Sequence, residues 1–93
     1  MTREPLFPLG QLVATPGAIE ALRAAGLDPL DLLGRHSHGD WGEVGADARR
    51  ANDRAVREGA RLLSAYTLPT GVRLWIITEA DRSATTFLLP EEY

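Results

Sequence analysis

Residues 61–89 read RLLSAYTLPTGVRLWIITEADRSATTFLL and contain three apolar runs separated by two turn signals. The middle run, Val72–Thr78, is rich in β-branched and aromatic residues, which is typical of a central strand. Leu62–Leu68 and Ala84–Leu89 flank it, and short apolar runs of this length also favour strands. The turn signals are Pro69-Thr70-Gly71 and Asp81-Arg82-Ser83. This pattern predicts a three-stranded antiparallel meander.

The residues before the meander carry helix signals. Thr15 is a good N-cap and Pro16 suits the first helical position, so we expect a helix over Ala18–Ala25 that ends at Gly26. Asp28 followed by proline repeats the signal and predicts a second helix. This second helix is expected over Pro29–His36 and is followed by a loop over Ser37–Gly45. A third and longest helix is predicted over Ala46–Glu58. A short edge strand is predicted at Gln11–Ala14, before the first helix.

The apolar spacing within each helix predicts which side chains face the core. In the first two helices these are Ile19, Leu22, Leu30, Leu32 and Leu33, and in the third Ala48, Ala51, Ala55 and Val56. Helices followed by an antiparallel meander predict an α+β fold with the helices packed on one sheet face. At 93 residues, the chain 1–93 is expected to be a single domain.

Composition excludes several classes of protein. The chain has no cysteine, which excludes disulfides, thiolate zinc sites and cysteine nucleophiles. Its net charge of −3 does not favour nucleic acid as a partner, although all ten cations are arginine. No apolar run approaches the ~20 residues that span a bilayer, and the N-terminus lacks a signal-peptide apolar region. We therefore expect a cytoplasmic protein that does not contact membranes.

The end of the second helix carries a first group of candidate residues, His36, His38 and Asp40. Two histidines near a carboxylate could support acid–base chemistry or bind a metal ion, or they could cap the helix. No further ligand follows at a characteristic spacing, so the sequence predicts neither a metal site nor a cofactor.

Trp41 lies between Asp40 and Gly42 in the glycine-rich loop and allows two interpretations. Its indole could fill the space under the loop, or it could present a surface for stacking or for a protein partner.

Polar side chains crowd the turn before the last strand. Arg82 beside hydroxyl groups could bind a phosphate, with Glu79 as a base. Alternatively, Arg82 could pair with Glu79 or Asp81 and fasten the turn. The hydroxyl residues concerned are Ser83, Thr85 and Thr86.

The third helix and its C-terminal flank carry five arginines against three acidic residues over 46–61. Arginines three or four residues apart share a helix face, which could be an ordinary solvated face or an anion-binding ridge. The candidate anion-binding residues are Arg50, Arg54, Arg57 and Arg61.

Three segments, LGQLVATPGAIEAL, the loop pattern RHxxGDWG and the ending LLSAYTLPTGVRLWIITEADRSATTFLLPEEY, together resemble a small bacterial family of uncharacterised proteins. Its members are carried on plasmids, phages and integrative elements and sometimes bear the label of a type I restriction modification subunit. The chain has no room for a methyltransferase domain. The resemblance implies a role in conflict between host and element, such as antirestriction.

Two functional hypotheses follow. The first is a non-enzymatic binding or accessory protein that contacts a protein partner or itself, as a homodimer, through exposed aromatic and acidic residues. The residues proposed for that contact are Trp41, Asp40, Glu79, Arg82 and Tyr93.

The second hypothesis is a metal-independent ribonuclease of the barnase or RelE type, because in these enzymes too the helices precede an antiparallel sheet in the chain. Its candidate catalytic residues are His36, His38, Arg73, Arg82, Thr85 and Thr86.

Overall fold

A computed structural model describes residues 4–93 and has the predicted α+β character. Its elements in chain order are β1 (Gln11–Ala14), α1 (Pro16–Ala25), α2 (Pro29–Ser37), α3 (Ala46–Glu58), β2 (Leu62–Thr67), β3 (Arg73–Thr78), β4 (Ala84–Leu88) and the short 3-10 helix η1 (Pro90–Glu92). Each lies within one or two residues of its predicted bounds, apart from η1, which the sequence did not suggest.

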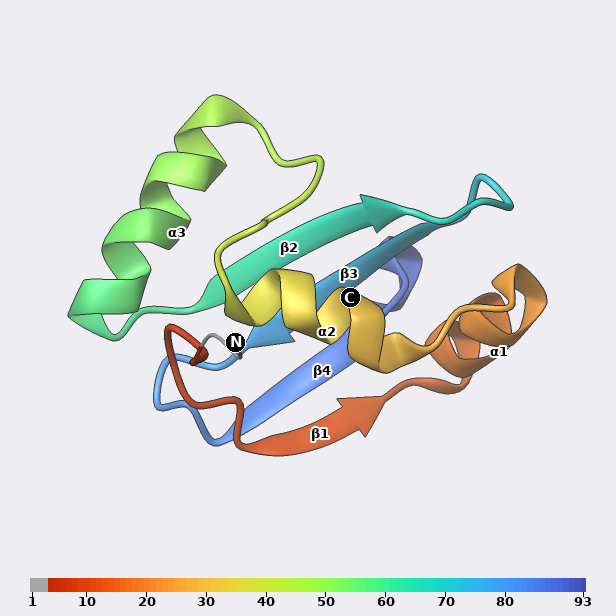
Figure 1. Cartoon of the computed structure of the whole chain (residues 1–93), viewed down its shortest axis with the longest axis horizontal. Coiled ribbons are helices and arrows are strands. Elements are labelled where there is room, and N and C mark those ends of the chain that lie inside the picture. Colours follow the sequence, from red (N-terminus) through yellow and green to blue (C-terminus); the bar gives the residue numbers. More distant parts are fainter. Residues whose placement is uncertain (1–3) are drawn as a thin grey trace.

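The sheet has four strands in the order β1-β4-β3-β2 (Figure 1). The predicted meander is present, because β2 pairs antiparallel with β3, and β3 antiparallel with β4. The edge strand predicted at Gln11–Ala14 is confirmed as β1, but it pairs with β4 in parallel, so the sheet is mixed and has four strands rather than a three-stranded antiparallel meander alone. Gln11 lies opposite Ala84 in this pair, so the strand that begins the fold and the strand that ends the sheet are neighbours.

The core lies between the helices and one face of this sheet. Cross-strand register places Tyr66, Leu74 and Phe87 on that face, where they pack with Leu22 of α1 and Leu33 of α2. A second cluster, at the other end of the same face, contains Phe7, Trp41, Ala55 of α3 and Leu62 of β2. Figure 1 shows α2 crossing this face and α3 beside β2. The opposite face is covered in part by the C-terminal residues.

Side-chain caps fix where α1 and α2 begin, as the sequence indicates. Thr15 Oγ1 accepts a hydrogen bond from the Ala18 amide at 3.1 Å, and Asp28 Oδ1 accepts one from Leu30 at 2.9 Å. Glu92 adds a contact from the far end of the chain, because its carboxylate accepts hydrogen bonds from the Thr15 hydroxyl at 2.5 Å and the Gly17 amide at 3.2 Å. These bonds hold the pKa of Glu92 below its usual range, with the Thr15 bond as the main cause.

The inward face of α3 differs from the prediction. Ala51 is exposed, whereas Asn52 is buried beside Ala55. The Asn52 amide donates to the Leu63 carbonyl at 2.8 Å and accepts from the Leu63 amide at 3.2 Å. The Asn52 amide thus satisfies the backbone N–H and C=O of Leu63, as a neighbouring strand would, and it holds α3 against the edge of β2.

Candidate functional site

A continuous chain of hydrogen bonds lies inside the protein, centred on His36. His36 is fully buried; its Nδ1 lies 2.6 Å from Ser64 Oγ and its Nε2 lies 2.9 Å from Thr78 Oγ1. Thr78 Oγ1 in turn lies 2.7 Å from Thr85 Oγ1, and the Thr85 hydroxyl donates to the Leu9 carbonyl at 2.7 Å. Because helix α2, three strands and the residues before β1 all contribute to it, this chain ties together distant parts of the sequence.

The Leu9 carbonyl fixes the direction of every proton in this chain, because a carbonyl can only accept. Thr85 donates to it, so Thr78 must donate to Thr85, and His36 Nε2–H must donate to Thr78. His36 Nδ1 is then the acceptor for the Ser64 hydroxyl. The neutral ring therefore satisfies every partner, and burial lowers the pKa of His36 from 6.5 to about 4. These contacts are those of a structural histidine in the core.

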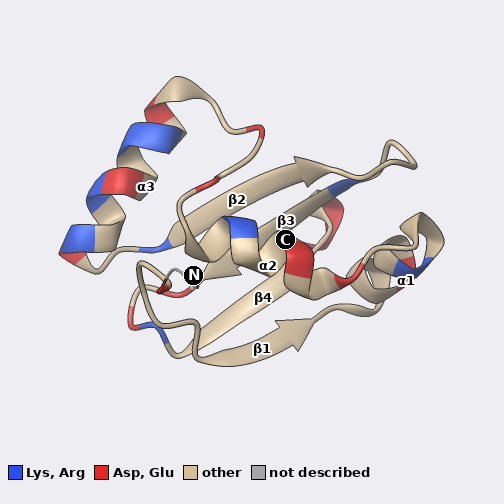
Figure 2. Cartoon of the chain, in the orientation of Figure 1, with Lys and Arg blue, Asp and Glu red and all other residues tan. Residues whose placement is uncertain are grey.

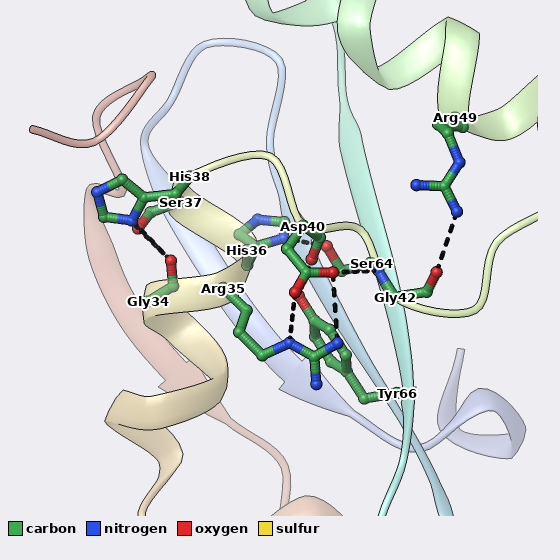
Figure 3. Close-up of polar contacts among 10 residues, drawn as sticks. All are labelled: Gly34, Arg35, His36, Ser37, His38, Asp40, Gly42, Arg49, Ser64 and Tyr66. Atoms are coloured by element: carbon green, nitrogen blue, oxygen red, sulfur yellow. Dashed lines mark hydrogen bonds and ion pairs between the residues drawn. The ribbon is translucent and has the colours of Figure 1, made fainter. Parts of the chain in front are cut away.

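The loop after α2 is held by an ion pair (Figure 3). Arg35 Nε and Nη2 lie 2.7 and 3.3 Å from the two carboxylate oxygens of Asp40, and the same guanidinium lies 4.6 Å from the centre of the Tyr66 ring. The Tyr66 hydroxyl donates to the Asp40 carbonyl at 2.6 Å, and burial raises the pKa of that hydroxyl to about 12. Arg35 lowers the pKa of the Asp40 carboxyl. His38 Nδ1–H donates to the Gly34 carbonyl at 2.7 Å, one turn back in α2.

Trp41 fills the space under this loop, and the expectation that it is an exposed aromatic is wrong. Only 1% of its surface is accessible. Its ring stacks on Phe7 with the centroids 6.2 Å apart and meets His36 edge-on at 5.7 Å, while its Nε1–H donates to Asp53 of α3 at 3.0 Å. The glycines on either side let the backbone turn around the indole: Gly42 has φ +73°, and a side chain there would collide with the Ala65 carbonyl.

Arg82 fastens the β3–β4 turn, as one of its two interpretations predicted, but it bonds to backbone carbonyls rather than to a carboxylate and also reaches the end of α3. Its Nη1 donates to the carbonyls of Ala60 at 2.6 Å and Glu79 at 3.1 Å, and its Nη2 donates to the Ala55 carbonyl at 2.9 Å. Ala55 lies in the last turn of α3, and its carbonyl also accepts from the Gly59 amide at 2.9 Å and the Ala60 amide at 3.3 Å. The Arg82 guanidinium thus adds a charged donor to the C-terminal cap of α3 rather than presenting an open fork for a phosphate.

We expect Arg82→Ala to lower the free energy of unfolding by about 1.5–3 kcal/mol, because three backbone carbonyls lose a charged donor. Urea denaturation followed by circular dichroism measures this change. Arg54→Ala on the exposed face of α3 is the matched control, with an expected change within about 0.5 kcal/mol. Equal stability of the two variants would contradict the capping role.

The arginine-bearing face of α3 is solvated and interleaved with acidic residues (Figure 2). Arg50 forms an ion pair with Asp47, and Arg57 Nη1 donates to the Asp53 carbonyl at 3.4 Å. Arg61 lies beyond the C-terminus of α3 and does not share this face. Its guanidinium donates to the Tyr93 hydroxyl and lies 3.4 Å from a Glu79 carboxylate oxygen. The four candidate anion-binding arginines therefore do not form one ridge.

On the sheet face away from the helices, the C-terminal residues pack against β3. Tyr93 meets the Trp75 ring edge-on at a centroid distance of 5.8 Å, with the Arg61 guanidinium 5.6 Å from the Tyr93 ring centre. Tyr93 is 69% exposed, as predicted. Glu79 contacts Tyr93 and Trp75 indirectly, through Arg61. Asp40 and Arg82, which were predicted to share a contact surface with Tyr93, bond to other partners and lie away from it.

The candidate ribonuclease residues are not brought together in one accessible cleft. His36 and Thr85 are fully buried, and both form hydrogen bonds to the Thr78 hydroxyl within the core. Arg73, at the first position of β3, and Arg82, beyond its last, are separated by more than the length of the strand, roughly 17 Å. Thr86 lies on the opposite sheet face from Thr85, since successive strand residues alternate.

An apolar groove lies on the helix-covered face, between β1, α1 and α2. Its volume is about 390 Å³, and Leu12, Ile19 and Leu30 line it together with the more buried Leu33 and Phe87. Of the seven large hydrophobic side chains that are exposed in residues 4–93, three lie on this face and line the groove, and these are Leu12 at 48%, Ile19 at 48% and Leu30 at 62%. Val13, at 42%, borders the groove from β1, but strand alternation puts its side chain on the opposite sheet face. Contiguous exposed apolar surface of this kind marks interaction sites.

The groove adjoins an open sheet edge. Gln11 and Thr15 direct their amides toward β4, where they donate to the carbonyls of Ser83 and Phe87 at 3.0 Å. Because a strand alternates, the backbone groups of Leu12 and Ala14 point away from the sheet. Among the described residues, no hydrogen bond engages them.

The other edge of the sheet is protected. The Ala65 amide of β2 donates to the Trp41 carbonyl at 3.0 Å, and the Glu43 amide donates to the Ala65 carbonyl at 2.6 Å. The loop after α2 therefore covers the middle of β2, and within residues 4–93 the strand that presents unpaired backbone beside an apolar groove is β1.

Sequence reasoning missed this groove, although a signal was present. Ile19 and Leu30 were predicted to face the core, and both are exposed. Helical periodicity correctly identified the apolar faces of α1 and α2, but nothing in residues 4–93 covers Ile19 and Leu30 on these faces. Apolar residues that lie on such a face but stay exposed in the monomer indicate a contact surface.

No group of three or more histidine, aspartate or glutamate side chains within residues 4–93 is placed to hold a metal ion. None of the helices in that range is long and apolar enough to cross a membrane. Comparison of the chain with protein-family models, curated proteins and solved structures finds no match. The resemblance described above therefore stays an expectation drawn from the sequence.

Proposed function

We propose that this protein is a small non-enzymatic binding protein that acts through a protein–protein contact, made at the open edge of β1 and the adjoining groove. The observation that carries the proposal is the clustering of the exposed Leu12, Ile19 and Leu30 side chains around one groove beside unpaired backbone, with Val13 exposed on the other face of the same strand. A partner that adds a strand to β1 would bury these side chains and satisfy the backbone groups together. The Trp41 side chain, by contrast, is packed inside the protein and is not available for this contact.

The setting of the contact rests on the sequence resemblance alone. The resemblance implies a role in conflict between host and mobile element, so we include an antirestriction or other defence-related role in the proposal. The chemistry of the surface is compatible with such a role, because it requires binding and no bond-breaking step.

Leu30→Glu tests the contact surface. Leu30 is 62% exposed, so the change is expected to alter the free energy of unfolding by no more than about 0.5 kcal/mol. A carboxylate at the groove should weaken binding about tenfold or more, as expected for a central apolar contact. The measurement is quantitative pull-down from a bacterial lysate, in which proteins retained by the wild type, including further copies of the chain, are identified by mass spectrometry.

Thr67→Glu is the matched control, because Thr67 is exposed on β2, at the protected edge of the sheet. Proteins held by the wild type and by Thr67→Glu, and lost from Leu30→Glu, would support the proposal. Equal capture by all three would place the contact elsewhere, and no capture by any of them would count against a binding function.

A further inference from the structure

We infer that the partner at the β1 edge is a second copy of this chain, with the two β1 strands paired antiparallel across a two-fold axis. The inference rests on the proposed function and names its partner. The resulting sheet would be continuous through both copies, and both open edges would disappear at once.

The charges around the groove favour an uncharged occupant. β1 has the sequence QLVA and carries no charge (Figure 2). Arg23 is the one charged residue of the described chain that lines the groove, and its Nη1 lies 3.3 Å from Glu20 of the same helix. A charged segment would meet no free counter-charge there. An apolar, uncharged strand is complementary to this surface, and β1 itself is such a strand.

The backbone allows one register for this pairing. Leu12 and Ala14 have the outward-facing backbone groups, so an antiparallel pair that uses all of them sets Leu12 opposite Ala14 of the second copy. Centring the axis on Leu12 would set Ala14 against Gly10, where φ is +65° and the backbone is not extended. Centring it on Ala14 would set Leu12 against Pro16, which has no amide hydrogen. The axis therefore passes between the two copies of Val13.

Side chains in this register are also complementary. Leu12 of one copy lies beside Ala14 of the other, and Ala14 lines the groove with only a methyl group. The larger leucine can thus enter the groove over the smaller alanine. On the opposite sheet face, Val13 meets Val13 of the second copy as a β-branched cross-strand pair, which stabilises antiparallel strands.

Four paired residues form a small contact. Interfaces that bury less than about 1,200 Å² in total are typical of weak or transient complexes. We therefore expect a dissociation constant on the order of micromolar, so the dimer should be populated at tens to hundreds of micromolar chain.

A single introduced cysteine tests the register, because the chain has none of its own. Residues in a non-hydrogen-bonded antiparallel pair have Cα atoms about 4.5 Å apart, within the range for a disulfide. Val13→Cys should therefore form a disulfide-linked dimer under mild oxidation, detected by non-reducing electrophoresis. Leu12→Cys is the matched control and should not, because its two copies lie two positions apart in this register.

Sedimentation equilibrium of the wild-type chain gives a second, independent measurement. Val13→Lys sets two like charges opposite each other and should weaken the dimer about tenfold, whereas Thr67→Lys should leave it unchanged. A wild-type chain that stays monomeric at several hundred micromolar would overturn the inference. So would a dimer in which Leu12→Cys cross-links as readily as Val13→Cys. If the chain is monomeric but the pull-down partners still depend on Leu30, the inference fails and the proposed function stands.

Discussion

Replacing Trp41 with alanine is expected to lower the free energy of unfolding by about 3–5 kcal/mol, the range for large aromatic side chains removed from a core. The indole is 1% exposed and fills the space between Phe7, His36 and α3. Because domains of this size are stable by about 5–15 kcal/mol, this loss is a large share of the total. Urea denaturation monitored by circular dichroism measures it.

Two variants separate the parts of this effect. Trp41→Phe keeps a ring but removes the Nε1–H that donates to Asp53, so its cost should be smaller than that of Trp41→Ala. Trp75→Ala is the control for removal of an indole, because Trp75 is only half-buried on the other sheet face. A Trp41→Ala variant no less stable than Trp75→Ala would show that the loop does not depend on its tryptophan.

Stability is expected to fall by about 3 kcal/mol between pH 6.5 and pH 4 through His36 alone. Burial lowers the pKa of His36 from 6.5 in the unfolded chain to about 4 in the folded protein. In this window the unfolded chain binds a proton that the folded protein does not, so lowering the pH favours unfolding. Above pH 6.5 and below pH 4, His36 contributes no further change. Free energies of unfolding from urea titrations at several pH values measure the slope.

Other titrating groups are expected at lower pH and should not obscure this slope. The pKa values of Asp40, Asp81 and Glu92 are held below their ordinary values, by bonds to Arg35, Ser83 and Thr15 respectively. The stability that they contribute is present above their unfolded pKa values of about 4 and is lost as the pH falls below them.

His36→Gln should remove the slope between pH 6.5 and 4, because the amide can donate to Thr78 and does not titrate. His38→Gln is the matched control and should retain it. An NMR titration of the wild type adds a direct readout, in which the imidazole signals of His36 should not shift between pH 7 and 5. A His36 signal that titrates near 6.5 in the folded protein would contradict the buried neutral ring.

Local signals in the sequence predicted the helices and strands well. Thr15 and Asp28 act as the caps that their positions indicate, and the turn residues separate the three C-terminal strands where expected. Such features depend on neighbours within a few residues. The parallel pairing of β1 with β4 depends instead on residues about 70 positions apart, and nothing in a four-residue strand specifies so distant a partner.

The roles of individual side chains were harder to predict because they depend on tertiary partners. The burial of His36 requires the hydroxyls of Ser64 and Thr78, which are 28 and 42 residues away. Asn52 is buried only because the Leu63 backbone lies beside it. Ile19 and Leu30 were assigned to the core on correct periodicity, yet the surface that would cover them is missing from the monomer. Their exposure leaves apolar surface beside the β1 edge.

The pairing of β1 with β4 also determines when a growing polypeptide can form the sheet edge that we propose as its contact surface. On a ribosome, residues 11–14 emerge early and have no strand to join until residues 84–88 have been made. Phe87 of that last strand also lines the groove, so neither half of the surface exists on an incomplete chain. Nascent chains in which β4 has not yet been made therefore lack the surface that we propose for self-association.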